Sequence, residues 1–371
     1  MSVFHPFEVA FCGYSGTGKT TLIEKLVKAF SSQMLNIGYL KHDAHKFKID
    51  HEGKDSFRLA QAGSKKVIIN DQAHWASVAQ ESLSPIEIQQ QFIQCDWLFI
   101  EGYKKIDAEK IVFLDEKTEI LNEFKDLKKE KILAFVYTGK PPKKEELLLG
   151  VPLVERNDIQ KIEELIQKNF ASNVNKDLIG LVLAGGFSTR MKQDKGALSY
   201  YGRSQVQYMS DLLSPMVKEC YVSVREQQLE NNPHLRGLSL LVDKFPSKGP
   251  MAGILSGLEE FPHQPILVVA CDLPLVAEDV LQDLIDSRNP YKVATCFLNP
   301  EKGWPEPLCT LWEPKAKSIL YSYLGIGRHC PRKILFNSSI ESIEVKDRKA
   351  LQNANTPEDY DYIKKQIEVG L

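Results

Sequence analysis

The stretch Gly13-Tyr14-Ser15-Gly16-Thr17-Gly18-Lys19-Thr20 matches the pattern G-x-x-x-x-G-K-[ST] and directly follows an apolar run at residues 7–12. A strand that leads into such a turn points successive backbone N–H groups into a concavity that holds phosphate oxygens. The Lys19 ammonium then lies on the β- and γ-phosphates, and the Thr20 hydroxyl can bind Mg²⁺. The stretch therefore predicts a nucleotide site at the edge of an α/β sheet.

A second glycine-rich loop lies about half a chain further on. It reads Leu183-Ala184-Gly185-Gly186-Phe187-Ser188-Thr189-Arg190, follows another apolar run, and is itself followed by Asp194 and Lys195. The glycines let the backbone approach a nucleoside triphosphate closely, and the cations Arg190 and Lys195 can neutralise its phosphates. The chain is therefore expected to carry two nucleotide sites of different design.

Composition sets the limits of the interpretation. The chain has 371 residues, a net charge of −2 and 43% hydrophobic residues, which predicts two soluble globular domains with neither nucleic acid nor membrane as partner. No apolar run approaches the ~20 residues that span a bilayer, and the first residues do not resemble a secretory signal. The seven cysteines form no C-x-x-C pair, which favours free thiols and a cytoplasmic location.

Apolar runs and amphipathic segments alternate along the whole chain. Strands are predicted at residues 7–12, 37–41, 66–70, 97–101, 110–114, 132–137, 178–184, 219–224, 238–242, 265–270 and 292–296. Helices are predicted at residues 19–30, 84–94, 159–170, 204–213, 250–260, 277–287 and 356–369. The pattern predicts an α/β protein of two doubly wound domains, a P-loop NTPase followed by a Rossmann-like nucleotidyltransferase. A short polar stretch gives the boundaries 1–171, a linker at 172–176, and 177–371.

Acidic residues follow two of the apolar runs. Glu101 ends the run at 97–101, where an acid can lie beside the Mg²⁺ of the first site. Asp272 follows the run at 266–270, at the carboxyl edge of the second sheet, where it can hold Mg²⁺ against nucleotide phosphates. An aspartate before Leu-Pro also suits a simple turn, but the neighbouring glycine-rich loop favours the metal role.

Two features of the first half leave alternatives open. His42 and His45 lie in a polar cluster after a strand, which fits either a ligand-binding loop or a solvated one. No Asn-Lys-x-Asp element follows the run at 132–137, so the base bound at the first site is not decided by the residues.

The separated motifs of the first half together resemble the molybdopterin-guanine dinucleotide adaptor GTPases. The motifs are G-x-x-G-x-G-K-T-T-L, which includes Thr21, then K-H-D-x-H-x-F-x-I-D, G-K-D-S, and Glu101-Gly102-Tyr103-Lys104. The resemblance covers most of the first ~170 residues. It implies GTP binding and weak GTP hydrolysis in support of molybdenum cofactor maturation.

The second half, from about residue 178 onward, resembles the molybdenum cofactor guanylyltransferases. By this resemblance Leu183, Ala184, Gly185 and Lys195 hold GTP, Asp243 contacts the nucleoside, and Asp272 binds both Mg²⁺ and nucleotide. Asn355 and Asn353, in Asn353-Ala354-Asn355-Thr356-Pro357, would lie near the metal or the pterin phosphate.

Two positions depart from the family pattern. Lys192 stands where the family usually has glycine, and it would strain the loop if that position needs a positive φ. Ser223 stands where the family uses asparagine, so a nucleotide contact from this position is not expected.

The two halves together predict a fusion enzyme that transfers GMP from GTP to molybdopterin-bound molybdenum cofactor and releases pyrophosphate. Arg190, Lys195 and Asp272 are the expected catalytic residues, with Mg²⁺ as cofactor. The resemblance implies a molybdenum insertion protein and molybdoenzyme apo-proteins or their chaperones as partners. Two alternatives are a cytidylyl- or sugar-phosphate nucleotidyltransferase of the same fold, and a nucleotide-dependent cofactor carrier without transferase activity.

Overall fold

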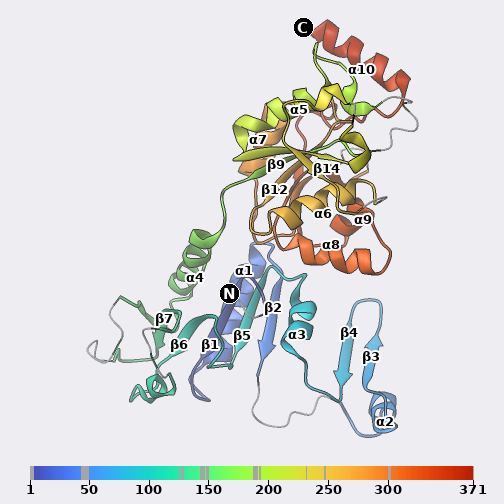
Figure 1. Ribbon diagram of the computed structural model, residues 1–371. Coiled ribbons are helices and arrows are strands. Elements are labelled where there is room, and N and C mark those ends of the chain that lie inside the picture. The colour runs from blue at the N-terminus through green and yellow to red at the C-terminus, as the bar shows by residue number, and fades with distance from the viewer. Residues whose placement is uncertain are drawn as a thin grey trace. The chain divides into compact units, whose positions relative to one another are not determined.

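The computed structural model describes residues 4–42, 50–124, 126, 129–142, 147, 150–186, 191, 194–230, 232–245, 248–299 and 302–370. The chain divides into two compact units, Met1–Ser172 and Asn173–Leu371 (Figure 1). Within the described residues, no helix combines the length and the apolar character needed to cross a membrane.

The first unit is built on a six-stranded parallel sheet in the order β2-β5-β1-β6-β7-β8. Its strands are β1 (Glu8–Cys12), β2 (Ile37–Lys41), β5 (Trp97–Glu101), β6 (Glu109–Phe113), β7 (Ile132–Tyr137) and β8 (Leu153–Glu155). Its main helices are α1 (Lys19–Ser32), α3 (Pro85–Phe92) and α4 (Ile159–Asn173). The helix α4 continues into the stretch that was expected to be a linker.

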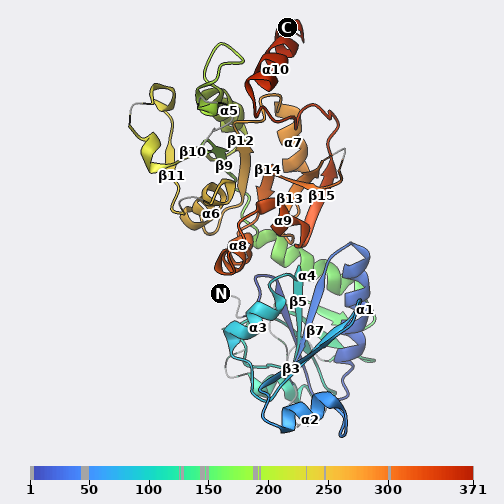
Figure 2. The same ribbon diagram turned by 90° about the vertical axis from the view of Figure 1, so that its right-hand side faces the viewer.

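Alternating strand residues direct the packing on the two faces of this sheet. On one face, Trp97 packs edge-on against Phe30 of α1 and Phe170 of α4. On the other face, Ala10 and Ile100 join a buried cluster that includes Ile88 of α3. Figure 2 shows α1 and α3 on opposite sides of the strands. The unit is therefore doubly wound, as the sequence predicts.

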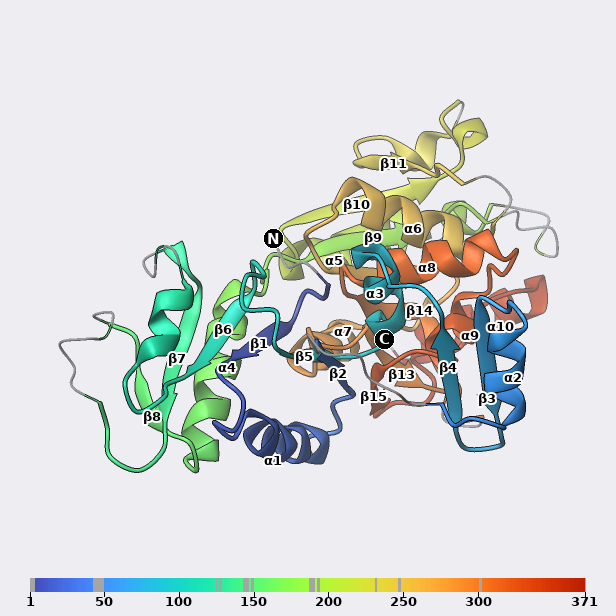
Figure 3. The same ribbon diagram turned by 90° about the horizontal axis from the view of Figure 1, so that it is seen from below.

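A two-stranded antiparallel hairpin stands apart from this sheet (Figures 1 and 3). It consists of β3 (Lys66–Asn70) and β4 (Trp75–Ala79), next to the short helix α2 (Asp55–Gln61). Residues 66–70 form the expected strand, but its partner β4 is not evident in the sequence. The apolar residues Ile68, Ile69 and Trp75 of the hairpin are largely exposed.

The second unit has a seven-stranded sheet in the order β11-β10-β9-β12-β14-β13-β15. Its strands are β9 (Ile179–Leu183), β10 (Glu219–Val224), β11 (Leu240–Val242), β12 (Ile266–Ala270), β13 (Ala294–Leu298), β14 (Pro305–Trp312) and β15 (Ile340–Glu344). Its helices are α5 (Gln205–Leu213), α6 (Pro250–Glu260), α7 (Glu278–Asp286), α8 (Ala316–Gly325), α9 (Pro331–Phe336) and α10 (Pro357–Gly370). The strand β14 is antiparallel to β12 and β13, and all other pairs in the sheet are parallel.

Three layers form this unit. Val182, Val222 and Leu267 share one buried cluster with residues of α5 and α7. The helix α6 lies on the other face, so close that a Cβ at Gly257 would be 3.0 Å from Leu181 and 2.9 Å from Ile266. Because β9, β10, β11 and β12 are parallel, their carboxyl ends meet at one edge, and the loops that follow them surround a cavity there.

Candidate functional site

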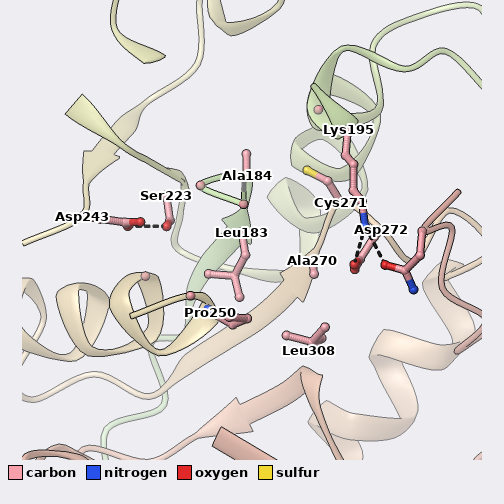
Figure 4. Close-up of a pocket in the computed structure, with 16 residues that line it drawn as sticks. Leu183, Ala184, Lys195, Ser223, Asp243, Pro250, Ala270, Cys271, Asp272 and Leu308 are labelled. Carbon is pink, nitrogen blue, oxygen red and sulfur yellow. Dashed lines mark hydrogen bonds and ion pairs between the residues drawn. The ribbon is translucent and has the colours of Figure 1, made fainter. Parts of the chain in front are cut away.

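The cavity at the carboxyl edge of the second sheet has a volume of about 350 Å³. Its lining combines the glycine-rich loop after β9, the ends of β10, β11 and β12, and the start of α6. Figure 4 shows the side chains around it, which are Leu183, Ala184, Gly185, Gly186, Lys195, Gly196, Ser223, Asp243, Gly249, Pro250, Gly253, Ala270, Cys271, Asp272, Leu308 and Asn355. The residues Leu183, Ala184, Gly185, Gly186 and Lys195 of the second glycine-rich loop, together with Asp243 and Asp272, therefore line one cavity.

Gly185 gives Asp243 its place in this cavity. A Cβ at position 185 would lie 2.6 Å from Asp243 Oδ2, which is closer than real Cβ contacts come. The other carboxylate oxygen, Oδ1, accepts a hydrogen bond of 2.6 Å from Ser223 Oγ. Burial raises the pKa of Asp243 above its ordinary value, because the charged form loses its hydration. A polar ligand group that donates to this carboxylate would restore the lost hydrogen bonding.

Ser223 lines the cavity, and its side chain contacts both Asp243 and α6. Its hydroxyl is engaged by Asp243, and it packs against α6 at Gly253, where any Cβ would overlap Ser223 Oγ. The small pair Ser223 and Gly253 lets the helix approach the sheet closely at the floor of the cavity.

Lys195 and Asp272 meet on the opposite wall of the cavity (Figure 4). Lys195 Nζ lies 3.2 Å from Asp272 Oδ2 and donates a hydrogen bond of 2.8 Å to Asn355 Oδ1. Asp272 Oδ1 is buried and has no hydrogen-bond partner among the residues that the structure describes. A buried carboxylate oxygen left without a donor suits a metal ligand, because a cation satisfies it directly.

The carboxyl-terminal segment is anchored to the end of β12. Ala354 N donates to Asp272 O at 2.8 Å, and Asp359 Oδ2 accepts from both Asn355 N and Thr356 N at 2.9 Å. This cap begins α10 as the sequence predicts. It brings Asn355 into the cavity, whereas Asn353 is not among the lining residues.

A buried polar group that the sequence does not single out holds the two ends of the glycine-rich loop together. Gln228 Nε2 donates to Ala184 O at 3.0 Å and to Asp194 Oδ2 at 3.2 Å. Asp194 Oδ1 in turn accepts from Gly196 N at 2.9 Å, which fixes the turn that carries Lys195. Gln228 lies in an ordinary polar stretch, so no local signal marks it.

Arg190 and Lys192 lie outside the described residues.

The phosphate loop of the first unit has the backbone its glycines predict. Gly16 and Gly18 adopt φ values of +81° and +88°, which favour glycine. Lys19 Nζ donates to Tyr14 O at 2.7 Å, and burial lowers the Lys19 pKa from its ordinary value. Thr20 Oγ1 lies 2.9 Å from Glu101 Oε2, so the hydroxyl and the acid predicted to hold Mg²⁺ are adjacent. Ser15, Thr17 and Thr21 lie in the same loop and first helical turn.

Two aromatic residues shape the rim of this first site. Tyr39 OH donates to Glu101 Oε2 at 2.7 Å, and burial together with this bond raises the Tyr39 pKa. The ring of His42 packs against that of Tyr103, with a centroid separation of 4.4 Å and an interplanar angle of 38°. His42 is thus packed against an aromatic ring, while His45 lies outside the described residues. In neither unit do three or more His, Cys, Asp or Glu residues cluster as a metal site within the described parts.

Comparisons with known proteins assign each unit to a family. Residues 8–138 match the family model described as molybdopterin guanine dinucleotide synthesis protein B, and residues 180–339 match the MobA-like NTP transferase domain. The chain is 39% identical over 186 residues to a molybdenum cofactor biosynthesis bifunctional protein from Synechocystis, a match that covers 50% of this chain and 53% of that protein.

Each of two further relatives matches only one unit of the chain, along most of the relative's own length. A molybdopterin-guanine dinucleotide biosynthesis adapter protein from Haemophilus influenzae is 35% identical, over 42% of this chain and 84% of its own length. A "probable molybdenum cofactor guanylyltransferase" from Nostoc is 28% identical, over 49% of this chain and 88% of its own length. The chain therefore belongs to the molybdopterin guanine dinucleotide synthesis protein B family through its first unit, and its second unit is a MobA-like NTP transferase domain.

Proposed function

We propose that the chain is a bifunctional molybdenum cofactor biosynthesis protein whose second unit transfers GMP from GTP to molybdopterin-bound molybdenum cofactor. The observation that carries this proposal is the cavity in which Gly185 and Asp243 face Lys195 and Asp272. On one wall, the Asp243 carboxylate can accept a hydrogen bond from a nucleoside. On the other wall, Lys195 can pair with phosphates and Asp272 can bind a metal ion. The first unit, with its own phosphate loop, is proposed to be a GTP-binding adaptor with weak GTPase activity.

The proposed reaction needs no protein nucleophile, because the attacking group is already an anion. An oxygen of the terminal pterin phosphate attacks the α-phosphorus of GTP in line and forms a new P–O bond. The bond from the α-phosphorus to the oxygen that bridges to the β-phosphorus breaks, and pyrophosphate leaves with the electron pair. The products are the guanine dinucleotide cofactor and pyrophosphate. The task of the protein is alignment and neutralisation of charge.

Several residues of the two sites divide this task. Lys195, positioned by Asn355, neutralises charge that builds up on the phosphates. Asp272 and, in the first unit, Thr20 with Glu101 would hold Mg²⁺ through their oxygens. Mg²⁺ bound there would supply positive charge to nucleotide phosphates. Asp243 fits a donor group of the nucleoside. Arg190 is proposed as a further cation on the phosphates.

The proposed reaction requires partner proteins that supply and receive the cofactor. A molybdenum insertion protein would supply or complete the cofactor, and molybdoenzyme apo-proteins or their chaperones would receive it. Because all seven cysteines are free thiols, we place the reaction in the reducing cytoplasm.

Mass spectrometry of the product tests the proposed transfer. The purified chain is incubated with Mg²⁺, molybdopterin cofactor and GTP, CTP or UTP, and pyrophosphate release is followed in parallel. The expected result is a guanine dinucleotide product and pyrophosphate with GTP only. A cytidylyl product would favour the sister transferase of the same fold. GTP binding without any pyrophosphate release would favour the non-catalytic carrier.

A further inference from the structure

An arginine of the first unit lies against the phosphate loop although it is far from that loop in sequence. Arg156 directly follows β8, and its backbone N–H donates to Tyr137 O at 2.9 Å. A Cβ at Gly18 would overlap Arg156 Nη1 and lie 3.0 Å from Arg156 Cδ. Because Gly18 has no side chain, the Arg156 guanidinium can lie directly against the phosphate loop.

The guanidinium retains hydrogen-bonding capacity in this position. Arg156 Nε is buried and has no hydrogen-bond partner among the described residues. The neighbouring acid, Glu155, is engaged elsewhere, because its carboxylate accepts from Asn157 N at 2.6 Å and from Asn157 Nδ2 at 3.2 Å. A buried N–H without an acceptor is costly, and a phosphate oxygen is an acceptor that suits arginine well.

The turn that carries Arg156 is fastened to the helix that follows the phosphate loop. Lys25 of α1 donates to Asn157 Oδ1 at 3.2 Å. The arginine is therefore held relative to the loop by contacts on both sides, its backbone bond to Tyr137 and this side-chain bond to α1. A cation held in this way loses little further freedom when it binds a ligand.

The order of the strands identifies the end of the nucleotide that Arg156 faces. Glu101, which lies beside Thr20, ends β5 on one side of β1, whereas Arg156 follows β8, beyond β6 and β7 on the other side. The Thr20 hydroxyl marks the metal and the terminal phosphates. Arg156 consequently approaches the loop from the side opposite Thr20 and Glu101, where the α-phosphate and nucleoside of a bound nucleotide would lie.

We propose that Arg156 is a nucleotide-binding residue of the first site and that its guanidinium contacts the α-phosphate of a bound guanine nucleotide. The inference deepens the proposed function, because it rests on the first unit binding nucleotide. It assigns to Arg156 a role in affinity for both the diphosphate and the triphosphate, since the α-phosphate is common to both.

Titration of the full-length chain with fluorescent GDP tests the inference. Both units can bind nucleotide, so the GDP binding that the wild type shows and the Lys19→Ala variant lacks is assigned to the first site. We expect R156A to weaken this Lys19-dependent binding by about tenfold or more, and R156K to retain part of it because it keeps the charge. Arg58→Ala is the matched control, since Arg58 is exposed on α2 and pairs only loosely, at 3.6 Å, with Asp55. It should bind as the wild type does.

The outcomes separate the two proposals. Wild-type affinity in both R156A and R156K, with the Lys19-dependent signal intact, would overturn the role of Arg156 alone. No Lys19-dependent binding in the wild-type chain would overturn the nucleotide site itself and the inference with it. Thermal melting of each variant identifies unfolding, and R156K keeps the test valid if R156A unfolds.

Discussion

One carboxylate oxygen of Asp272 pairs with Lys195, and the other has no hydrogen-bond partner among the described residues. This arrangement predicts the effect of replacing the carboxylate by an amide. Asp272→Asn keeps the shape and the partner of Lys195 but removes the charge that would hold Mg²⁺. Guanylyl transfer should fall about a thousandfold, equivalent to about 4 kcal/mol of transition-state stabilisation. The rate of pyrophosphate release measures this. Asp286→Asn, an exposed change at the end of α7, is the control. Near-normal transfer in D272N would mean that Asp272 only forms a turn.

Adjacent glycines in the second loop provide a matched pair of variants. Gly185→Ala places a Cβ 2.6 Å from Asp243 Oδ2, whereas a Cβ at Gly186 meets no atom within 4 Å. We expect G185A to displace Asp243 and raise the KM for GTP by about tenfold, since roughly 1.4 kcal/mol of binding corresponds to that factor. G186A should raise the KM less, because its Cβ displaces no protein atom. Equal effects of the two substitutions would contradict the close approach of Asp243 to this loop.

Lys195 and Lys192 should differ strongly in importance. Lys195→Ala removes the cation that contacts Asp272 and Asn355, so transfer should become slower and GTP binding weaker. Lys192→Gly should leave transfer unchanged or slightly faster, because any backbone strain at that position is worth only about 1 kcal/mol. Steady-state kinetics of both variants distinguish the two. The reverse order of sensitivity would show that this loop has been aligned wrongly with its relatives.

The start of α10 supports the site through Asp359. Backbone hydrogen bonds from Asn355 and Thr356 lower the Asp359 pKa below its ordinary value. The stabilisation is therefore complete above the unfolded-state pKa of about 4 and is lost as the pH falls through the lower folded-state pKa. Asp359→Asn should cost about 1 kcal/mol at neutral pH and also slow transfer, because Asn355 loses its anchor.

Melting curves as a function of pH check this prediction. The difference in melting temperature between wild type and D359N should be constant near neutrality and shrink below about pH 4. Glu358→Gln, in the same helical turn and exposed, should not show the effect. A difference that persists unchanged to low pH would contradict the role of the carboxylate.

Local structure could be predicted from the sequence better than contacts between distant segments. The caps at Ser84 and Thr356 form as predicted, because each depends on residues within a single turn. The antiparallel strand β14 is not evident from the sequence, since Pro305 and Pro307 weaken its strand pattern. Likewise, the glycine-rich loops could be identified locally, whereas Gln228 and Arg156 reach these loops only through the fold.

Each unit has its own buried cluster and its own phosphate loop. Lys19→Ala should therefore abolish GTP hydrolysis by the first unit and leave guanylyl transfer measurable. Conversely, D272N should retain the hydrolysis that depends on Lys19. Release of phosphate and of pyrophosphate from the same samples separates the two activities. Loss of all transfer in a folded K19A variant would contradict two independent sites.

The ion pair between Lys195 and Asp272 has a thermodynamic consequence for the order in which ligands arrive. A divalent cation alone must compete with the ammonium for the carboxylate, and a triphosphate alone meets a cation already neutralised by its neighbour. When both ligands bind, the phosphates pair with Lys195 and the metal binds Asp272. Each ligand thus breaks the ion pair that weakens binding of the other. Metal and nucleotide should then show reciprocal positive cooperativity, a property that calorimetric titration can measure in the absence of any turnover.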